Sequence, residues 1–139
     1  MIERFLEAQA NGVYETALSE ISKDGYKSSH WMWYIFPQLK GLGFSRMAEK
    51  YSIENFIEAN EYVNNTILYQ RLLNISQAVF DINDKTIDYI FDYPDNLKFQ
   101  SCMTLFALIC PDEPIFQLNL DKYFNGEMCE YTQNKFYGL

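Results

Sequence analysis

Residues 27–38, KSSHWMWYIFPQ, hold the single histidine and both tryptophans of the chain. A segment so rich in large aromatic side chains needs burial, so the rest of the fold is expected to pack around it. Periodicity leaves two alternatives for residues 31–36, a short helix or a buried extended segment. Pro37, Gly41 and Gly43 predict an irregular, turn-rich loop after it. This segment is therefore the expected centre of the fold.

Apolar residues at three- and four-residue intervals predict helices on both sides of this segment. They indicate helices over residues 5–21 with a break at Asn11-Gly12, over 66–80 and over 97–110, the last apolar enough to be the central buried helix. Further helix starts are predicted at the capping residues Ser28 or Ser29, Ser45, Ser52, Asp84 and Pro114. After Gly126 the pattern fades. The expected fold is mainly α, a compact bundle of about six to eight helices forming a single domain over residues 1–139.

The cysteines and the N-terminus predict a cytoplasmic protein. The number of cysteines is odd, and the three, Cys102, Cys110 and Cys129, lack the paired spacing of a zinc site. We therefore expect reduced thiols and no bound metal. No signal peptide pattern begins the chain, and no apolar segment approaches the roughly 18 residues that span a bilayer. No cofactor motif is present either.

The charge is unevenly distributed along the chain. The net charge of −8 argues against a general nucleic-acid-binding surface. Residues 23–50 nevertheless hold five basic residues and two acidic ones, a net of +3. A positive patch in an acidic protein is suited to a small anion. The alternative is that these are solvated lysines that happen to cluster.

The histidine is the candidate for acid–base chemistry, because histidine changes charge near neutral pH. Lys27, Ser29 and Gln38 supply hydrogen-bond donors on either side of His30. A helix cap at Ser28 or Ser29 would direct free backbone N–H groups at an anion. The alternative is a structural histidine whose ring is satisfied by one backbone carbonyl.

The aromatic side chains offer a stacking surface. Trp31 or Trp33 could stack on a base, although such a run is more often core. Gly41-Leu42-Gly43, followed by Ser45 and Arg46, is similar to a phosphate-binding turn, but it lacks the spacing of a dinucleotide loop or a P-loop. Ser101 and Thr104, one helical turn apart, are weaker candidates for a pocket, and Cys102 is expected to be an inert buried thiol.

Three blocks of sequence resemble one bacterial family. The blocks are residues 4–9 (RFLEAQ), residues 29–43 (SHWMWYIFPQLKGLG) and residues 101–106 (SCMTLF). Together they are similar to the family known as domain of unknown function 1810, over nearly the whole chain. The resemblance implies a compact, mainly α-helical domain and no particular reaction. Members are sometimes labelled calpastatins, yet such an inhibitor would be extended and poor in aromatic residues, unlike this composition.

The chain departs from this family pattern at two places. Ser28 stands where a second basic residue often precedes the Ser-His pair, and Glu127 to Glu130 replace a common Asp. A looser likeness links residues 29–32 to the Glu-His-aromatic-Met segment of a family that processes NAD-linked and ADP-ribosyl compounds. Glu is absent at position 29, so the likeness suggests a class of ligand and transfers no carboxylate mechanism.

These observations lead to two hypotheses. In the first, the domain binds a small phosphorylated ligand of the nucleotide, NAD or ADP-ribose type. Binding alone and binding followed by hydrolysis are both open alternatives at this point. Lys27, Ser29 and Arg46 would then hold phosphate, Trp31 or Trp33 would stack on the base, and His30 would act on the leaving group. In the second, an exposed aromatic face docks a protein partner or a second copy of the chain.

Overall fold

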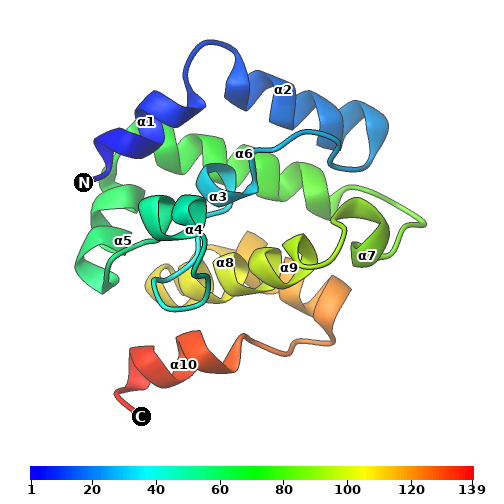
Figure 1. The fold of residues 1–139 in the computed structure, drawn as a ribbon. Helices are drawn as coiled ribbons and strands as arrows, with labels where there is room; N and C mark the ends of the chain where they lie inside the picture. The colour runs from blue at the N-terminus through cyan, green and yellow to red at the C-terminus, as the bar shows by residue number, and fades with distance from the viewer.

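The computed structural model describes all 139 residues, and it is mainly α-helical as predicted (Figure 1). Ten α-helices and one π-helix form it, more than the six to eight expected, because several helices are only four to seven residues long. Their bounds in chain order are α1 Glu3–Gln9, α2 Val13–Ser19, the π-helix η1 Glu20–Asp24, α3 Met32–Ile35, α4 Arg46–Tyr51, α5 Phe56–Asn64, α6 Thr66–Phe80, α7 Ile87–Ile90, α8 Asp95–Ile109, α9 Pro114–Phe124 and α10 Glu130–Tyr137. No helix is long and apolar enough to cross a membrane.

Residues 31–36 lie in the core, as the sequence predicts. Only Met32–Ile35 are helical, and Trp31, Met32, Ile35 and Phe36 are all buried. The Phe36 ring meets Phe91 and Phe99 at centroid distances of 5.7 and 5.0 Å. The segment therefore packs against the end of α7 and against α8, so it brings the N-terminal and C-terminal parts of the chain into contact.

The central helix is α8, which contacts α5, α7, α9 and α10. Six consecutive residues of α8, Ser101–Phe106, are buried, which fits a helix that is covered on all sides. Its two hydroxyls have structural partners: Ser101 Oγ donates to the Leu97 carbonyl and Thr104 Oγ1 donates to the Gln100 carbonyl. Burial raises the pKa of the Cys102 thiol, so this cysteine is inert as expected.

Several predicted helix starts are shifted. Ser45 caps α4 through a bond from the Ala48 N–H, as predicted, and Asn65 caps α6. Neither Ser28 nor Ser29 caps a helix, because α3 begins three residues later without a side-chain cap. Asn55 takes the role expected of Ser52, and Thr86 that expected of Asp84. Asn55 and Thr86 each directly precede an apolar residue, Phe56 and Ile87, at the first position of the helix.

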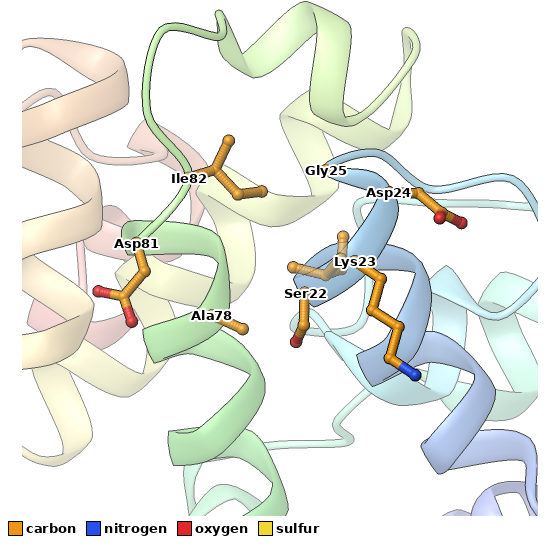
Figure 2. A pocket seen from close by; sticks show the side chains of 8 residues that line it. Ser22, Lys23, Asp24, Gly25, Ala78, Asp81 and Ile82 are labelled. Carbon is orange, nitrogen blue, oxygen red and sulfur yellow. The ribbon is translucent and has the colours of Figure 1, made fainter.

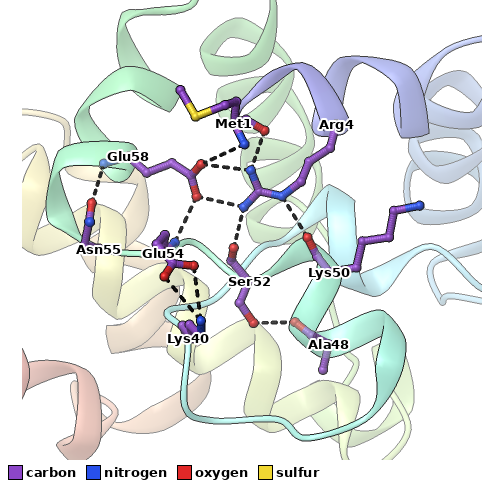
Figure 3. A network of polar contacts seen from close by, with 9 residues as sticks. All are labelled: Met1, Arg4, Lys40, Ala48, Lys50, Ser52, Glu54, Asn55 and Glu58. Carbon is purple, nitrogen blue, oxygen red and sulfur yellow. Dashed lines mark hydrogen bonds and ion pairs between the residues drawn. The ribbon is translucent and has the colours of Figure 1, made fainter.

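An ion-pair network joins α1 to α5, to the end of α4 and to the residues between them (Figure 3). The Arg4 guanidinium forms two bonds to the Glu58 carboxylate, at 2.8 and 2.7 Å. It also donates to the carbonyls of Met1, Lys50 and Ser52. All five N–H donors of this arginine are thereby used.

This network predicts an acid-sensitive stability. Hydrogen bonds from Arg4 hold the pKa of Glu58 at about 2, below its ordinary 4.5. The carboxylate therefore stabilises the fold above pH 4.5, and this contribution is lost as the pH falls towards 2. In urea unfolding between these pH values, wild type is expected to lose more stability than Glu58→Gln, whereas the exposed control Glu49→Gln should follow wild type. Parallel curves for wild type and Glu58→Gln would contradict this.

The C-terminal helix α10, which the sequence does not predict, docks on the loop 37–43. Tyr131 donates from its hydroxyl to the Lys40 carbonyl at 3.0 Å. Gly41 makes room for it: an added Cβ would lie 2.0 Å from the Tyr131 hydroxyl, and the Gly41 φ is +106°. Gly41 thus serves helix docking, and the phosphate-binding role suggested for this turn has no support here.

We expect Gly41→Ala to displace Tyr131 and loosen α10, lowering the free energy of unfolding by about 2 kcal/mol through steric clash and backbone strain. Chemical denaturation and limited proteolysis of α10 would measure this. Gly12→Ala is the matched control, because its φ is +83° with nothing within 4 Å of an added Cβ. Equal losses in both variants would mean that the Tyr131 contact contributes nothing.

Candidate functional site

A buried carboxylate, which the sequence analysis missed, organises the segment around His30. Glu20 is 6% exposed and stands at the first position of η1. Its Oε1 accepts the N–H groups of Ser28 and Ser29 at 2.8 and 3.0 Å and the Trp31 indole N–H at 2.9 Å. Its Oε2 accepts the Ser29 hydroxyl. Four donors from three residues are thus fixed by one side chain.

The hydrogen bonds keep Glu20 ionised. Burial by itself would raise its pKa, but the bonds from Ser29, Ser28 and Trp31 together outweigh burial and lower it. A signal for this residue did exist in the sequence. Glu20 follows Ala17 by three positions on the buried face of the N-terminal helices, where a carboxylate needs partners.

His30 lies at a pocket of about 250 Å³ between the α1–α2 turn and α3. The lining residues are Asn11, Gly12, Val13, Thr16, Ser29, His30, Trp31 and Tyr34. The His30 side chain is exposed, and its carbonyl accepts the Tyr34 hydroxyl at 3.1 Å. The buried Gln9 side chain donates a hydrogen bond from its amide nitrogen to the Tyr34 carbonyl at 2.8 Å. Three predicted site residues, Ser29, His30 and Trp31, therefore meet at one pocket.

The anion-binding cap expected at Ser28 and Ser29 does not exist. Their N–H groups point to Glu20, so a negative charge of the protein already occupies the place expected for a phosphate. The Ser29 hydroxyl donates to the same carboxylate. Like charges repel, so a phosphate would not bind at these N–H groups. Ser29 can still offer a lone pair to a ligand.

Lys27, in the loop after η1, belongs to a different cluster, which it forms with Asp95 and Lys98 of α8. Its ammonium lies 2.8 Å from Asp95, and the Lys98 ammonium lies 3.6 Å from the other oxygen of the same carboxylate. The Lys27 side chain is only 13% exposed. Lys98 also lies over the Trp33 ring, 5.3 Å from its centroid. The charge of Lys27 is already paired with Asp95, which does not favour the phosphate-holding role predicted for it.

Gln38 and Trp33 line a second, narrow cavity together with Lys98. Its volume is about 10 Å³, room for about one water molecule. The Gln38 side chain is 9% exposed and its amide bonds to no protein group, while its backbone pairs with Ile53. A water molecule suits this amide, but no nucleotide fits there.

Two more predicted contacts, Trp31 and Arg46, do not offer what the nucleotide hypothesis needs. The Trp31 side chain is 2% exposed and packs against Phe36 and Phe91, so no face of its ring is open to a base. Arg46 opens α4, is exposed and forms no ion pair. The predicted set is thus divided among the His30 pocket, the narrow cavity at Gln38 and Trp33, the ion-pair cluster at Asp95 and the surface.

A larger cavity of about 380 Å³ lies between η1 and the end of α6 (Figure 2). Figure 2 shows Ala78 and Ile82 pointing into the gap, whereas Lys23 and Asp24 point away from it. None of the predicted site residues line it. Its lining is mixed, with Ser22, Lys23, Asp24 and Asp81 beside the apolar Ile21, Ala78 and Ile82. Elsewhere in the chain, no three His, Cys, Asp or Glu side chains come together as a metal site.

The comparisons with known proteins agree on a family without a known role. A family model described as "Protein of unknown function (DUF1810)" matches residues 1–136. The fold is similar to the crystal structure of the conserved hypothetical protein Rv1873 from Mycobacterium tuberculosis, with a TM-score of 0.91 and a sequence identity of 39%. The match covers 94% of this chain and 92% of that one. No curated protein matches.

Proposed function

The chain belongs to the DUF1810 family of proteins of unknown function, and from the pocket at His30 we propose that it binds a small nucleotide-type ligand through the ligand's ribose. The observation that supports this most is the convergence of Ser29, His30 and Thr16 on one pocket whose loop Glu20 holds rigid. A site that is ordered before its ligand arrives binds more tightly, because less conformational entropy is lost.

The size of the pocket limits the part of the ligand that enters it. Pockets that enclose drug-sized molecules measure about 300–1,000 Å³. At about 250 Å³, this pocket has room for one sugar or one base, not a whole dinucleotide. In an ADP-ribose or NAD ligand, the rest of the molecule would lie on the surface beyond His30.

The lining suits a sugar better than a phosphate. Asn11, Thr16 and Ser29 offer an amide and two hydroxyls, which match the alternating donors and acceptors of ribose hydroxyls. No lysine or arginine lines the pocket. A phosphate on the ligand would therefore lie at the rim, where the His30 side chain is the ring nitrogen donor among the lining residues. Hydrolysis of the ligand would depend on His30 for proton transfer.

A thermal-shift and calorimetry series would test the proposal with ribose 5-phosphate, AMP, ADP-ribose and NAD. A ligand at a hundred times its dissociation constant should stabilise the wild type by about 2.7 kcal/mol. Thr16→Val and His30→Ala should each weaken binding about tenfold while leaving the unliganded melting temperature nearly unchanged, since both side chains are exposed. Thr66→Val, at an exposed threonine of α6, is the control.

The proposal fails if no compound gives heat or a shift at millimolar concentration. It also fails if a compound binds Thr16→Val and His30→Ala as tightly as wild type, because the ligand would then occupy another site. A lower unliganded melting temperature in His30→Ala, without any ligand effect, would show that His30 is structural.

A further inference from the structure

An exposed surface around α7 combines tyrosines with aspartates. We call it the tyrosine–aspartate surface; it comprises Tyr26, Asp84, Asp88, Tyr89, Asp92, Tyr93 and Leu97. The three tyrosines are 41%, 50% and 77% exposed, and Leu97 is 46% exposed. None of these residues lines the His30 pocket. Large apolar groups exposed together on one surface commonly mark an interaction site.

The surface is held in place by contacts between three elements. Tyr26, from the loop after η1, packs edge-on against Tyr89 of α7 with 5.8 Å between ring centroids. The Asn96 amide of α8 donates to Asp88 of α7 at 2.8 Å. The Lys27 N–H donates to the Ile90 carbonyl at 2.9 Å. These contacts fix Tyr26, Tyr89 and Asp88, and Asp92 and Tyr93 follow within three residues of the end of α7.

The charge of this surface is strongly negative. Residues 81–95 contain five aspartates and one basic residue, Lys85. Asp95 is neutralised by Lys27 and Lys98, whereas Asp84 and Asp92 are exposed and their carboxylates take part in no ion pair or hydrogen bond. Unpaired carboxylates beside exposed aromatic rings attract cations in two ways, by charge and by the ring face.

The chain itself shows that these rings accept a cation. The Lys85 ammonium lies 4.5 Å from the centroid of the Tyr89 ring. Tyr93 has no such neighbour and is the most exposed of the three tyrosines. One ring is thus already used by a cation, and a second, beside Asp92, is open.

We propose that the tyrosine–aspartate surface binds an arginine-containing basic segment of a partner protein. A planar guanidinium can stack on Tyr93 and form two parallel hydrogen bonds with a carboxylate, whereas a lysine ammonium offers only a point charge. Nucleic acid is excluded as the partner because its phosphates would meet unpaired aspartates. The inference is independent of the ligand proposed for the His30 pocket.

Fluorescence anisotropy with the full chain and labelled peptides would test this. The probe is an Arg-Gly-Ser repeat with four arginines, and the comparison peptides carry lysine or the neutral analogue citrulline in its place. We expect the arginine peptide to bind more tightly than the lysine peptide, the citrulline peptide not to bind, and added salt to weaken binding. Tyr89→Ala/Tyr93→Ala and Asp84→Asn/Asp92→Asn should each weaken binding about tenfold.

Matched controls lie elsewhere on the surface. Tyr137→Ala, at a tyrosine of α10 that is 61% exposed, and Asp121→Asn, at an exposed aspartate of α9, should bind as wild type does. Equal affinity for the arginine and lysine peptides, or equal loss in the control variants, would overturn the proposal in favour of unspecific charge attraction. So would a concentration-dependent dimer in sedimentation that Tyr93→Ala abolishes, because the occupant would then be a second copy of the chain.

Discussion

Glu20→Ala is expected to be among the most destabilising single substitutions in this protein, lowering the free energy of unfolding by about 4 kcal/mol. The carboxylate accepts three N–H groups and one hydroxyl from residues 28–31. Without it, the buried Trp31 indole N–H has no acceptor in the core, and the loop that carries His30 is released. The corresponding fall in melting temperature is roughly 15 °C.

Two further variants make this prediction specific. Glu20→Gln retains the shape but replaces one acceptor oxygen with a donor, so we expect a smaller loss of about 2 kcal/mol. Glu15→Ala, at an exposed carboxylate of α2 that forms no hydrogen bond, should stay within about 0.5 kcal/mol of wild type. Fluorescence of Trp31 in a Trp33→Phe background, where it is the single tryptophan, would report the local change. If Glu20→Ala and Glu15→Ala melt alike, Glu20 does not organise the loop.

The second large effect is expected at the Arg4–Glu58 pair. Arg4→Ala should cost about 3–5 kcal/mol of stability, because it leaves the Glu58 carboxylate, whose side chain is 9% exposed, without its partner. The carbonyls of Ser52 and Lys50 lose a donor at the same time. Urea unfolding at neutral pH would measure the loss.

Arg4→Lys separates charge from geometry. An ammonium cannot make the two parallel bonds that the guanidinium makes to Glu58 while reaching Ser52 and Lys50, so only part of the stability should return. Arg46→Ala, at an exposed arginine without an ion pair, is the control and should change stability little. A loss in Arg4→Ala no larger than in Arg46→Ala would show that the network contributes nothing.

Much of the helical fold could be predicted from residues close in sequence. The helix Thr66–Phe80 has a regular apolar face, and Pro114–Phe124 begins at a proline and ends at Asn125-Gly126, so both were located nearly to the residue. The helix Glu130–Tyr137 was missed because only Thr132 of it is buried, which leaves no apolar pattern. Its position depends on contacts with Gly41 and Thr104, far away in the chain.

The candidate site could be predicted only in part. The segment was located correctly, because many large apolar side chains are concentrated in twelve residues and need burial, and Trp31, Met32, Ile35 and Phe36 are buried. Which of its donors remain free could not be predicted. Ser29 and Trp31 are satisfied by Glu20, nine and eleven residues away, across a π-helical turn that has no sequence signal.

The sequence by itself determined the helical class, the single core and the segment around which the core forms. Apolar periodicity and the concentration of aromatic residues are properties of residues close together in the chain. Only the tertiary structure decided which charges and donors face solvent. Lys27 pairs with Asp95, 68 residues later in the chain, and Arg4 with Glu58. Such pairs form when packing brings distant helices together, and partly buried charges are stable only with these partners. The side chains available to a ligand are those that have no partner within the fold, and His30 at the pocket is one of them.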